Sequence, residues 1–322
     1  MAEIVITEFM DAAGVEALAG FDVLYDPQLV DKAEALTAAL ADCRGLIVRN
    51  RTQVRPPLLE AAPRLQVVGR LGVGLENIDL AACAARGLPV LPATGTNDAT
   101  VAEYVMGAAL AMLKGGAFHA TASVVAGEWP RTKLLGGRDA QGLTLGLVGF
   151  GAIARQVARR ASAFSMRVLA SDPFIPADHP GWKELGVERR DLDAMLPEAD
   201  IVSIHVPMTP KTRGLLDAKA LARLPKGAYV INTARGGIVD EDALVEALKS
   251  GRLAGAALDV FDGEPVKAGS RFVGIPNLIL SPHIAGNTRD ANFRASTLTA
   301  ENVRCVLEGR PPKVADAARG AA

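Results

Sequence analysis

The sequence has few aromatic residues, few cysteines and almost no net charge. Aromatic side chains make up 4% of its 322 residues, too few for the base-stacking platforms of single-strand-binding proteins. The formal net charge is −1, with both signs mixed along the chain. The basic footprint of a nucleic-acid or anionic membrane surface is therefore lacking, and we expect neither as a partner.

Cysteines and long apolar runs are also scarce. Cys43, Cys83 and Cys305 are far apart and form no C-x-x-C pair, which favours reduced thiols over a disulfide framework or a metal site. No charge-free apolar run approaches the roughly 18 residues that a spanning helix needs, and the first residues lack the basic segment of a signal peptide. These absences predict a cytoplasmic protein that binds no metal.

Short apolar segments alternate with helix-compatible segments from residue 1 to about residue 95. This alternation is typical of parallel, doubly wound α/β sheets. The expected strands are 4–6, 22–25, 45–48, 65–68 and 88–91, and the expected helices are 31–41, 57–62 and 77–86. Because this part has no glycine-rich turn of its own, we interpret it as a partner domain and not as a nucleotide site.

An Ala-rich segment, 98–126, separates this part from a second alternating unit. We expect it to be helical, to break at Gly115-Gly116 and to cross into the second domain. The expected strands there are 145–148, 168–170, 199–205, 228–232, 255–259 and 278–280, and the expected helices are 152–164, 191–196, 218–224, 241–249 and 291–307. Since the last helix could return to the first domain, the predicted domains are residues 1–97 with 288–322, and residues 98–287.

The clearest functional signal lies in segment 145–172, which predicts a strand, a glycine turn, a helix and a strand that ends at Asp172. Gly149 permits a tight turn, and Gly151 lets backbone N–H groups approach a pyrophosphate where the helix begins. Ala154 replaces the third glycine of G-x-G-x-x-G, which close helix–strand packing tolerates. Without the flanking strands and the acid, the glycines would fit an ordinary β-turn-α unit. Asp172 would bind ribose hydroxyls and repel a 2′-phosphate, so the predicted cofactor is NAD.

The strand ends of the second unit carry a cation, a carboxylate and an imidazole, namely Arg235, Glu264 and His283. Ligands of such sheets bind beyond the carboxyl ends of the strands, at the edge that also carries the glycine turn. A 2-oxo acid needs this set, because Arg binds a carboxylate through two parallel hydrogen bonds and His donates a proton near neutral pH. A neighbouring carboxylate would fix the imidazole tautomer and favour its protonated form.

Each of these residues also has a structural interpretation when it is taken alone. Arg235 fits a solvated charge at a strand end, Glu264 a turn residue, and His283 a packing histidine. His205 fits the lining of a cofactor pocket better than proton chemistry, and Asp259 fits either a turn cap or a ligand of the nicotinamide half. The combination is what points to hydride transfer.

The order of these motifs resembles that of the D-isomer-specific 2-hydroxyacid dehydrogenase family over essentially the whole chain. The matching stretches are Val73-Gly74 with Asn77-Ile-Asp79, Asn97 with Val101-Ala-Glu103, Gly149-Phe-Gly-Ala-Ile153, Asp172-Pro173, Asn232-Thr-Ala-Arg235-Gly-Gly, Leu258-Asp-Val-Phe261 with Glu264-Pro265, and Ser281-Pro-His283-Ile-Ala-Gly. The departures are Ala154 and Ala93, where an asparagine is common. The resemblance implies a flavodoxin-like substrate domain and a Rossmann NAD-binding domain.

The resemblance also implies roles for individual residues. Arg235 would bind the substrate carboxylate and polarise the carbonyl, and His283, paired with Glu264, would be the acid/base. The expected cofactor-binding residues are Gly149, Phe150, Gly151, Ala152, Ile153, Asp172, His205, Val206, Pro207, Thr233, Ala234, Arg235, Asp259 and His283. Family members are usually homodimers joined through their nucleotide domains, with region 127–138 as part of an arm.

In this family the first domain usually decides the substrate. Its loops at 48–52 and 70–74 resemble those of 3-phosphoglycerate dehydrogenases and, at least as closely, those of (S)-sulfolactate dehydrogenases. Arginines near these loops suggest a second anion on the substrate, such as a C3 phosphate or sulfonate. The alternative is that Arg51 or Arg70 faces water or pairs with an acid across the domain cleft. The expected substrate-binding residues are Arg49, Arg51, Arg70, Val73, Gly74, Asn97 and Arg235.

Other functions remain open from the sequence. A glyoxylate or hydroxypyruvate reductase would keep the same trio without a second anion site. An NAD(H)-sensing binding protein, like the corepressors of the same family, can also keep the trio. Oxidation of formate is disfavoured because the formate enzymes pair their histidine with glutamine, where this chain has Glu264. The sequence ends soon after its last predicted helix, so we expect no C-terminal regulatory domain.

Overall fold

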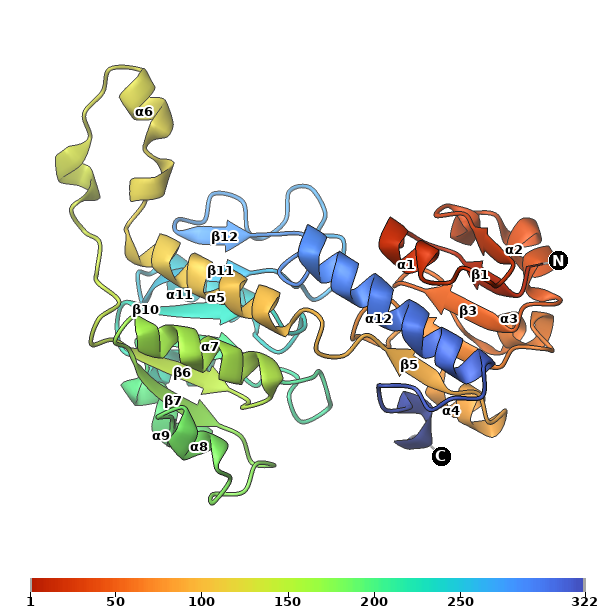
Figure 1. Ribbon diagram of the computed structural model, residues 1–322. Helices are drawn as coiled ribbons and strands as arrows, with labels where there is room; N and C mark the ends of the chain where they lie inside the picture. Colours follow the sequence, from red (N-terminus) through yellow and green to blue (C-terminus); the bar gives the residue numbers. More distant parts are fainter. Residues whose placement is uncertain (1, 321–322) are drawn as a thin grey trace. The chain divides into compact units, whose positions relative to one another are not determined.

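The computed structural model describes residues 2–320, which divide into two compact units (Figure 1). Unit 1 contains residues 2–97 and 287–320, and unit 2 contains residues 98–286. The sequence boundary was expected one residue later, after residue 287. Asn287 falls in unit 1, where its carboxamide oxygen accepts a hydrogen bond from Arg49 Nη2 at 2.7 Å. The end of the chain, residues 321–322 of the expected first domain, lies outside the described residues.

Unit 1 is built on a parallel sheet with the strand order β2-β1-β3-β4-β5. This is the flavodoxin-like order of a doubly wound sheet, so the prediction of a parallel α/β unit is confirmed. The strands are β1 (Ile4–Ile6), β2 (Val23–Tyr25), β3 (Gly45–Val48), β4 (Val67–Arg70) and β5 (Val90–Pro92). β1 and β3 are buried along their whole length, as strands covered on both faces must be.

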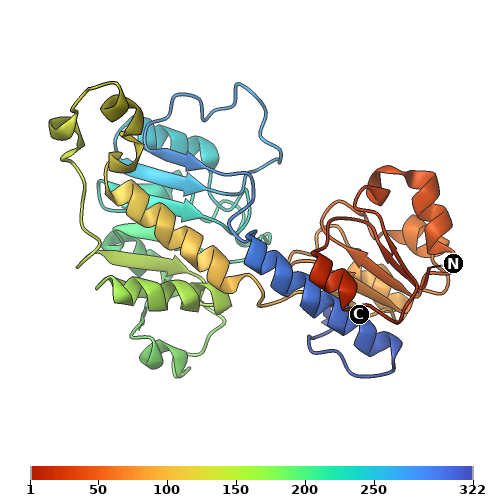
Figure 2. The ribbon, with the colours of Figure 1, turned by 45° about the horizontal axis from the view of Figure 1, so that its top comes forward.

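Helices cover both faces of this sheet (Figure 2). On one face α12 packs with Leu18, which follows α1, against Ile4, Ile6 and Ile47. Gly69 of β4 permits this contact, because a Cβ there would lie 2.7 Å from side-chain atoms of Thr299 and Val303. The other face is covered by α2, α3 and α4. The helices are α1 (Ala12–Glu16), α2 (Ala33–Leu40), α3 (Pro56–Ala61), α4 (Leu80–Ala85) and α12 (Arg289–Leu307).

Unit 2 contains a larger parallel sheet with the order β12-β11-β10-β9-β6-β7-β8. The order reverses between β6 and β9, which is the Rossmann switch point where such sheets bind ligands. The strands are β6 (Thr144–Val148), β7 (Arg167–Ser171), β8 (Glu188–Arg189), β9 (Ile201–Ile204), β10 (Ala228–Asn232), β11 (Leu253–Leu258) and β12 (Leu278–Leu280). The predicted second parallel sheet is therefore present, with β8 as an edge strand that the sequence pattern did not reveal.

The helices of unit 2 bury two apolar faces of this sheet. One core lies under α5 and α7, and the other under α9, α10 and α11 (Figure 1). These helices and the short α8 span α5 (Asp98–Leu113), α7 (Ala152–Ala163), α8 (Gly181–Glu184), α9 (Leu192–Met195), α10 (Ala218–Arg223) and α11 (Glu241–Lys249). The sheet is thus fixed from both sides, which leaves its strand ends as the places where side chains can meet a ligand.

An excursion of the chain, residues 114–138, follows α5 and stands off the body of unit 2 in both views (Figures 1 and 2). The helical segment expected over 98–126 breaks at Gly115-Gly116, as predicted: α5 ends at Leu113, and the two glycines have left-handed φ values of +57° and +84°. Only the short helix α6 (Thr121–Val125) and two single 3₁₀ turns follow before β6. We call residues 114–138 the arm.

Candidate active site

All strands of unit 2 run parallel, so their carboxyl ends meet at one edge of the sheet. This edge gathers the side chains that the sequence analysis picked from separate strand exits. Gly149 follows β6, Asp172 follows β7 and His205 follows β9. Arg235 lies three residues beyond β10, and the loops after β11 and β12 carry Glu264 and His283. The shared edge is a direct consequence of the parallel register.

The glycine turn is held tightly at the switch point. Gly149 has φ +95°, and a Cβ at this position would lie 2.7 Å from the carbonyl oxygen of His205. The amide of His205 donates to Val148 O at 2.7 Å, which brings the exits of β6 and β9 side by side. Only glycine meets both requirements, the left-handed φ and the close backbone approach.

The residues at this edge fit a dinucleotide. α7 begins directly after Gly151 and has no side-chain cap, so the first N–H groups of a positively polarised helix start are left for an anion. The Asp172 carboxylate accepts hydrogen bonds from the amides of Phe150 and Phe174, both at 2.9 Å, which fixes it beside the turn with lone pairs left for ribose hydroxyls. Thr233 Oγ1 is buried and has no hydrogen-bond partner among the described residues.

His205 follows β9 at this edge, and its side chain is buried. Burial lowers its pKa to about 4, so the imidazole is uncharged at neutral pH. Its Nε2 lies 2.9 Å from Ser203 Oγ, a hydrogen bond that fixes the ring. The expectation that His205 lines a cofactor pocket stays a prediction.

His283 and Glu264 form a hydrogen-bonded pair, with Nδ1 and Oε2 2.8 Å apart. The other oxygen of Glu264, Oε1, accepts from the amide of Phe261 at 3.0 Å, so the carboxylate is itself oriented. Because Nδ1 faces the carboxylate, it carries the proton of a neutral ring and Nε2 faces outward. About half of the His283 side chain is exposed, so Nε2 is accessible to a small molecule.

Asp259 organises the loop that carries His283. Its carboxylate, 1% exposed, accepts from Ser281 Oγ at 2.6 Å and from the amides of Ile284 and Ala285 at 2.8 Å each. The Asp259 carbonyl accepts from the amide of His283, also at 2.8 Å. These four bonds hold His283 at φ +53°, which is uncommon for a residue with a side chain. The structure therefore gives Asp259 a scaffold role.

Two residues that the sequence analysis did not select support these loops. Tyr104 of α5 lies 2.5 Å from Ser281 through its hydroxyl, and since Ser281 donates to Asp259, the tyrosine is the donor. Glu241, at the start of α11, accepts from the amide of Asp262 at 2.6 Å, and burial raises its pKa. Both partners lie far away in the sequence, so no local pattern could have revealed them.

Arg235 is positioned by the turn that follows β10. Asn232 Oδ1 accepts from the amide of Ala234 at 3.0 Å, and Asn232 Nδ2 donates to the Arg235 carbonyl at 2.8 Å. A Cβ at Gly236 would lie 1.8 Å from the Phe261 carbonyl oxygen. The Arg235 turn therefore packs directly on the loop that leads to Glu264, which explains the N-T-A-R-G-G sequence.

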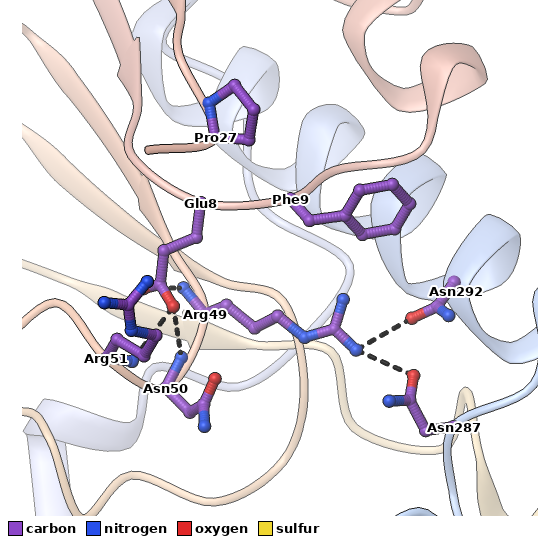
Figure 3. A pocket seen from close by; sticks show the side chains of 8 residues that line it. All are labelled: Glu8, Phe9, Pro27, Arg49, Asn50, Arg51, Asn287 and Asn292. Carbon is purple, nitrogen blue, oxygen red and sulfur yellow. Dashed lines mark hydrogen bonds between the residues drawn. The ribbon is translucent and has the colours of Figure 1, made fainter. Parts of the chain in front are cut away.

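The arginines expected to bind substrate lie in unit 1 and differ in their surroundings. Arg49 donates to Asn287 and Asn292 (Figure 3), and burial lowers its pKa while Glu8 opposes the shift. Arg51 is exposed and forms an ion pair with Asp31 of the same unit, whereas the alternative considered for it was an acid across the domain cleft. Arg70 donates from Nη1 to Leu71 O at 2.9 Å, and its guanidinium lies against Gly72.

The remaining expected substrate residues also lie in unit 1. Val73 is 42% exposed and Gly74 is partly buried. Asn97 Oδ1 is buried without a hydrogen-bond partner among the described residues. No group of His, Cys, Asp and Glu suited to a metal ion occurs within residues 2–320, and no helix there combines the length and apolar character needed to cross a membrane.

Comparisons with known proteins show which family the chain resembles. A family model described as D-isomer specific 2-hydroxyacid dehydrogenase, NAD binding domain, matches residues 106–285. The (S)-sulfolactate dehydrogenase of Chromohalobacter salexigens is 51% identical over 309 residues, which are 95% of this chain and 99% of that protein. The D-3-phosphoglycerate dehydrogenase of Methanocaldococcus jannaschii is 40% identical over 86% of this chain, but the chain spans only 52% of its length. The crystal structure of the TT0316 protein from Thermus thermophilus has a TM-score of 0.85 at 35% identity, covering 96% of this chain and 98% of that one.

Proposed function

Because the chain belongs to the D-isomer specific 2-hydroxyacid dehydrogenase family and carries its NAD-binding domain, we propose that it interconverts a 2-hydroxy acid and a 2-oxo acid that bears a second anionic group. The substrate would be of the 3-sulfolactate or 3-phosphoglycerate type. The observation that carries the proposal is the oriented His283–Glu264 pair at 2.8 Å on the same sheet edge as the NAD turn.

His283 acts as the acid/base in this proposal. Its Nε2 donates a proton to the carbonyl oxygen during reduction and removes it during oxidation, while Glu264 stabilises the imidazolium through Nδ1. A bound NAD, held at the Gly149 turn and by Asp172, would supply or accept the hydride at C2. Asp259 keeps the imidazole in place through the loop amides, so the proton moves at a fixed position.

Arg235 binds the substrate carboxylate. A guanidinium presents two parallel N–H groups to a carboxylate, and its charge polarises the adjacent carbonyl as negative charge develops on the oxygen. The turn formed by Asn232 and Gly236 fixes the direction in which Arg235 leaves the sheet. Substitution by Lys would keep the charge but lose the two-point contact.

The second anion is supported by two observations. The relative with 51% identity is named for sulfolactate, and the M. jannaschii relative for 3-phosphoglycerate, both of which carry an anion on C3. In unit 1, Arg49 lines a cavity together with amide side chains. The competing activity is glyoxylate or hydroxypyruvate reduction, for which Arg49 would have no anion to bind.

We further propose a homodimer in the cytoplasm. The arm exposes large apolar side chains, which in a soluble protein mark an interaction surface. These are Phe118, Val124, Val125, Trp129 and Leu135, with exposed fractions between 48% and 83%. The three cysteines are buried free thiols, consistent with a reducing compartment.

Steady-state oxidation of NADH with glyoxylate, hydroxypyruvate, phosphohydroxypyruvate and sulfopyruvate tests the proposed reaction. We expect the highest kcat/KM with one of the last two substrates. A preference for glyoxylate or hydroxypyruvate would contradict the proposal that the substrate carries a second anionic group. If the protein binds NADH but turns over none of the four substrates, the proposed dehydrogenase activity is contradicted. A nucleotide-sensing function would then be favoured.

The proton-transfer role of His283 is tested by substitution. His283→Ala is expected to lower kcat by about 10²–10⁴-fold, the usual contribution of a general acid/base, while NADH binding changes little. His119→Ala is the matched control, because His119 is exposed on the arm. A His283→Ala enzyme that keeps most of its turnover would rule out this mechanism.

A further inference from the structure

Two aromatic rings are stacked beside the glycine turn of unit 2. Phe150, the residue between the two glycines, is fully buried and stacks on Trp182 of α8, with ring centroids 4.0 Å apart and planes 7° apart. Trp182 donates from Nε1 to the carbonyl of Pro176 at 2.8 Å, which fixes the indole within its loop. The segment that leaves β7 after Asp172 therefore returns to the turn through α8 (Figure 1).

The glycine at position 181 lets α8 begin against the Phe150 ring. A Cβ on Gly181 would lie 3.0 Å from Nδ1 of His179 and 3.7 Å from Cε1 of Phe150. His179 Nδ1 accepts from the amide of Gly181 at 3.0 Å, and the His179 carbonyl accepts from the amide of Trp182 at 3.2 Å. These contacts fix the point at which the Trp182 side chain leaves the backbone, so the stack has a defined geometry.

Arg155 contacts the same phenylalanine from α7. Its Nε donates to the Phe150 carbonyl at 3.0 Å, and its guanidinium carbon lies 5.3 Å from the centre of the Phe150 ring. A cation within about 6 Å of a ring centre is attracted by the electrons of the ring face. Nη2 of Arg155 also lies 3.5 Å from Nε2 of His179. Arg155 thus connects α7 both to the glycine turn and to the loop that carries Trp182.

The backbone of Phe150 joins the glycine turn to Asp172. Its amide donates to Asp172 Oδ2 at 2.9 Å, and its carbonyl accepts from Arg155. Both neighbours of Phe150 are glycines, which have more backbone freedom than any other residue. The buried ring is therefore the anchor that restricts this turn. Through the Phe150 amide, the same anchor sets the position of the Asp172 carboxylate relative to the turn.

The stack also has a purely structural interpretation. Phe150 and Trp182 belong to the apolar core under α5 and α7, to which both contribute buried area. If burial were their whole role, truncation of Trp182 would lower the stability of unit 2 without a selective effect on any ligand. The backbone contacts of Phe150 argue for more, because a shift of its ring would move the turn and its bond to Asp172 together.

We propose that Trp182 and Arg155 are positioning residues of the NAD site, which hold Phe150 so that the glycine turn and Asp172 are arranged for the pyrophosphate and the adenosine ribose before the cofactor binds. A site that is arranged in advance loses less conformational entropy on binding. Without these contacts the ligand must order the turn, so the cost falls on cofactor affinity. The inference concerns the ADP-ribose half of NAD and does not depend on the proposed 2-oxo acid.

Calorimetric titration of the full chain with NADH and with ADP-ribose tests the role of Trp182. ADP-ribose contains the pyrophosphate and the adenosine ribose but lacks the nicotinamide. We expect Trp182→Leu to raise the Kd of both ligands by similar factors of about tenfold, which corresponds to about 1.4 kcal/mol and lies within the contribution of an aromatic pair. Trp182→Phe keeps a ring that can stack and should recover most of the affinity. Unchanged Kd values in a folded Trp182→Leu protein would overturn the proposal.

Variants of α7 separate the position of Arg155 from its charge. Arg155→Met and Arg155→Lys both remove the Nε donor, but Lys keeps the positive charge, and we expect each to raise the Kd of ADP-ribose about fivefold. Arg159→Met is the matched control, because it removes an exposed arginine from the next turn of the same helix and should leave the Kd unchanged. Wild-type affinity in Arg155→Lys, or an equal loss in Arg159→Met, would mean that charge alone acts and would overturn the role of Arg155.

Steady-state kinetics supply a second readout. The KM for NADH should rise with the Kd in Trp182→Leu and Arg155→Met, whereas kcat at saturating NADH should change less than about twofold. The reason is that Arg235, Glu264 and His283 follow other strands than the turn and Asp172. A fall in kcat as large as the loss of affinity would mean general distortion of the unit and would overturn the proposal.

The outcomes separate this inference from the proposed function. Thermal melting identifies variants that fail to fold, and if Trp182→Leu is one of them, Arg155→Met decides, because it removes no buried ring. A wild-type protein that binds neither NADH nor ADP-ribose would contradict the NAD site and this inference with it. Absence of turnover with every 2-oxo acid, despite the expected shifts in Kd, would contradict the proposed reaction and support the positioning role.

Discussion

Ser281 lies two residues before His283. It links the loop that carries His283 to Tyr104 of α5, which lies 177 positions earlier in the sequence. The chain of donors runs from Tyr104 to Ser281 and from Ser281 to the Asp259 carboxylate, with distances of 2.5 and 2.6 Å. The same carboxylate holds the amides of Ile284 and Ala285. Ser281 is therefore a positioning residue, since it fixes the anchor of the histidine loop without facing the substrate.

Removal of the Ser281 hydroxyl should impair proton transfer more than binding. Ser281→Ala leaves Tyr104 without its acceptor and Asp259 with one donor fewer, so we expect kcat to fall about tenfold while KM changes less, equivalent to the net loss of one good hydrogen bond. The pH profile of kcat/KM should change as well, because the setting of His283 changes.

A conservative substitution of Ser281 distinguishes a role in positioning the His283 loop from a role in the overall stability of the protein. Ser281→Thr keeps the hydroxyl and should restore most of the activity, while Tyr104→Phe should give a smaller loss than Ser281→Ala. If Ser281→Ala only lowers the melting temperature and leaves the pH profile and kcat intact, Ser281 has a structural role alone.

The sequence pattern pointed to the candidate reactive residues but not to the residues that support them. Arg235, Glu264 and His283 follow apolar strands, and the parallel sheet necessarily gathers strand ends at one edge. Tyr104 and Glu241 lie within helices with ordinary apolar spacing, and their partners are 177 and 21 positions away. The choice of such partners depends on how two elements pack, and this information is absent from a local pattern.

Among the structural elements, the loop after β3 shows how one buried acid can fix a functional segment. Glu8, just beyond β1, accepts four amide hydrogen bonds from residues 49–52, and Thr7 Oγ1 lies 2.7 Å from Thr52 Oγ1. The loop backbone thus gains the partners that buried amides require. Arg49 leaves the sheet in a direction that Glu8 determines.

Replacement of this acid should destabilise unit 1. Glu8→Gln exchanges one carboxylate oxygen for an NH₂ group that faces backbone donors, and we expect a loss of about 2–4 kcal/mol in the free energy of unfolding at pH 7. Urea denaturation measures this loss. Glu34→Gln on α2 is the control, because that side chain is exposed.

The stability difference should depend on pH with a definite sign. The folded-state pKa of Glu8 is lowered, so its contribution is complete above the ordinary Glu value of about 4.3 and is lost as the pH falls through the lower folded-state pKa. The wild-type and Glu8→Gln proteins should therefore differ equally at pH 7 and pH 5.5 and converge below about pH 4. A difference that grows on acidification would contradict this assignment.

Strands were predicted more closely than helix ends in this chain. The apolar runs at 4–6, 45–48, 228–232 and 278–280 coincide with β1, β3, β10 and β12. β8 was missed because Glu188 and Arg189 are exposed at the sheet edge and carry no apolar signal. The break expected at Gly115-Gly116 within segment 98–126 is confirmed, because α5 ends at Leu113 and both glycines have left-handed φ values.

At the scale of the whole molecule, two parallel sheets were predictable because each needs helices on both faces and so imposes a regular alternation on the sequence. The expected boundaries after residues 97 and 287 stand beside a division of the chain after residues 97 and 286. The alternation says nothing about which charges share a cavity. The pairing of Arg51 with Asp31 and of Arg49 with two asparagines required side-chain positions.

The arm leads to a prediction about assembly. Val125 and Trp129 are 83% and 78% exposed, an apolar surface that would be covered in the proposed homodimer. We expect the wild-type protein to have about twice the 33.6 kDa chain mass by light scattering. The double variant Val125→Ser/Trp129→Ser should shift toward monomer, because burial of these side chains supplies about 25 cal/mol per Å².

The control for this experiment is Phe293→Ser, which removes an exposed aromatic side chain from α12 in unit 1, outside the arm. It should leave the mass unchanged, since the proposed contact uses the nucleotide-binding unit. If the arm variant stays dimeric while Phe293→Ser becomes monomeric, the contact lies on unit 1. A wild-type mass equal to that of one chain would contradict the proposed homodimer. The arm would then not be covered by a second copy of the chain.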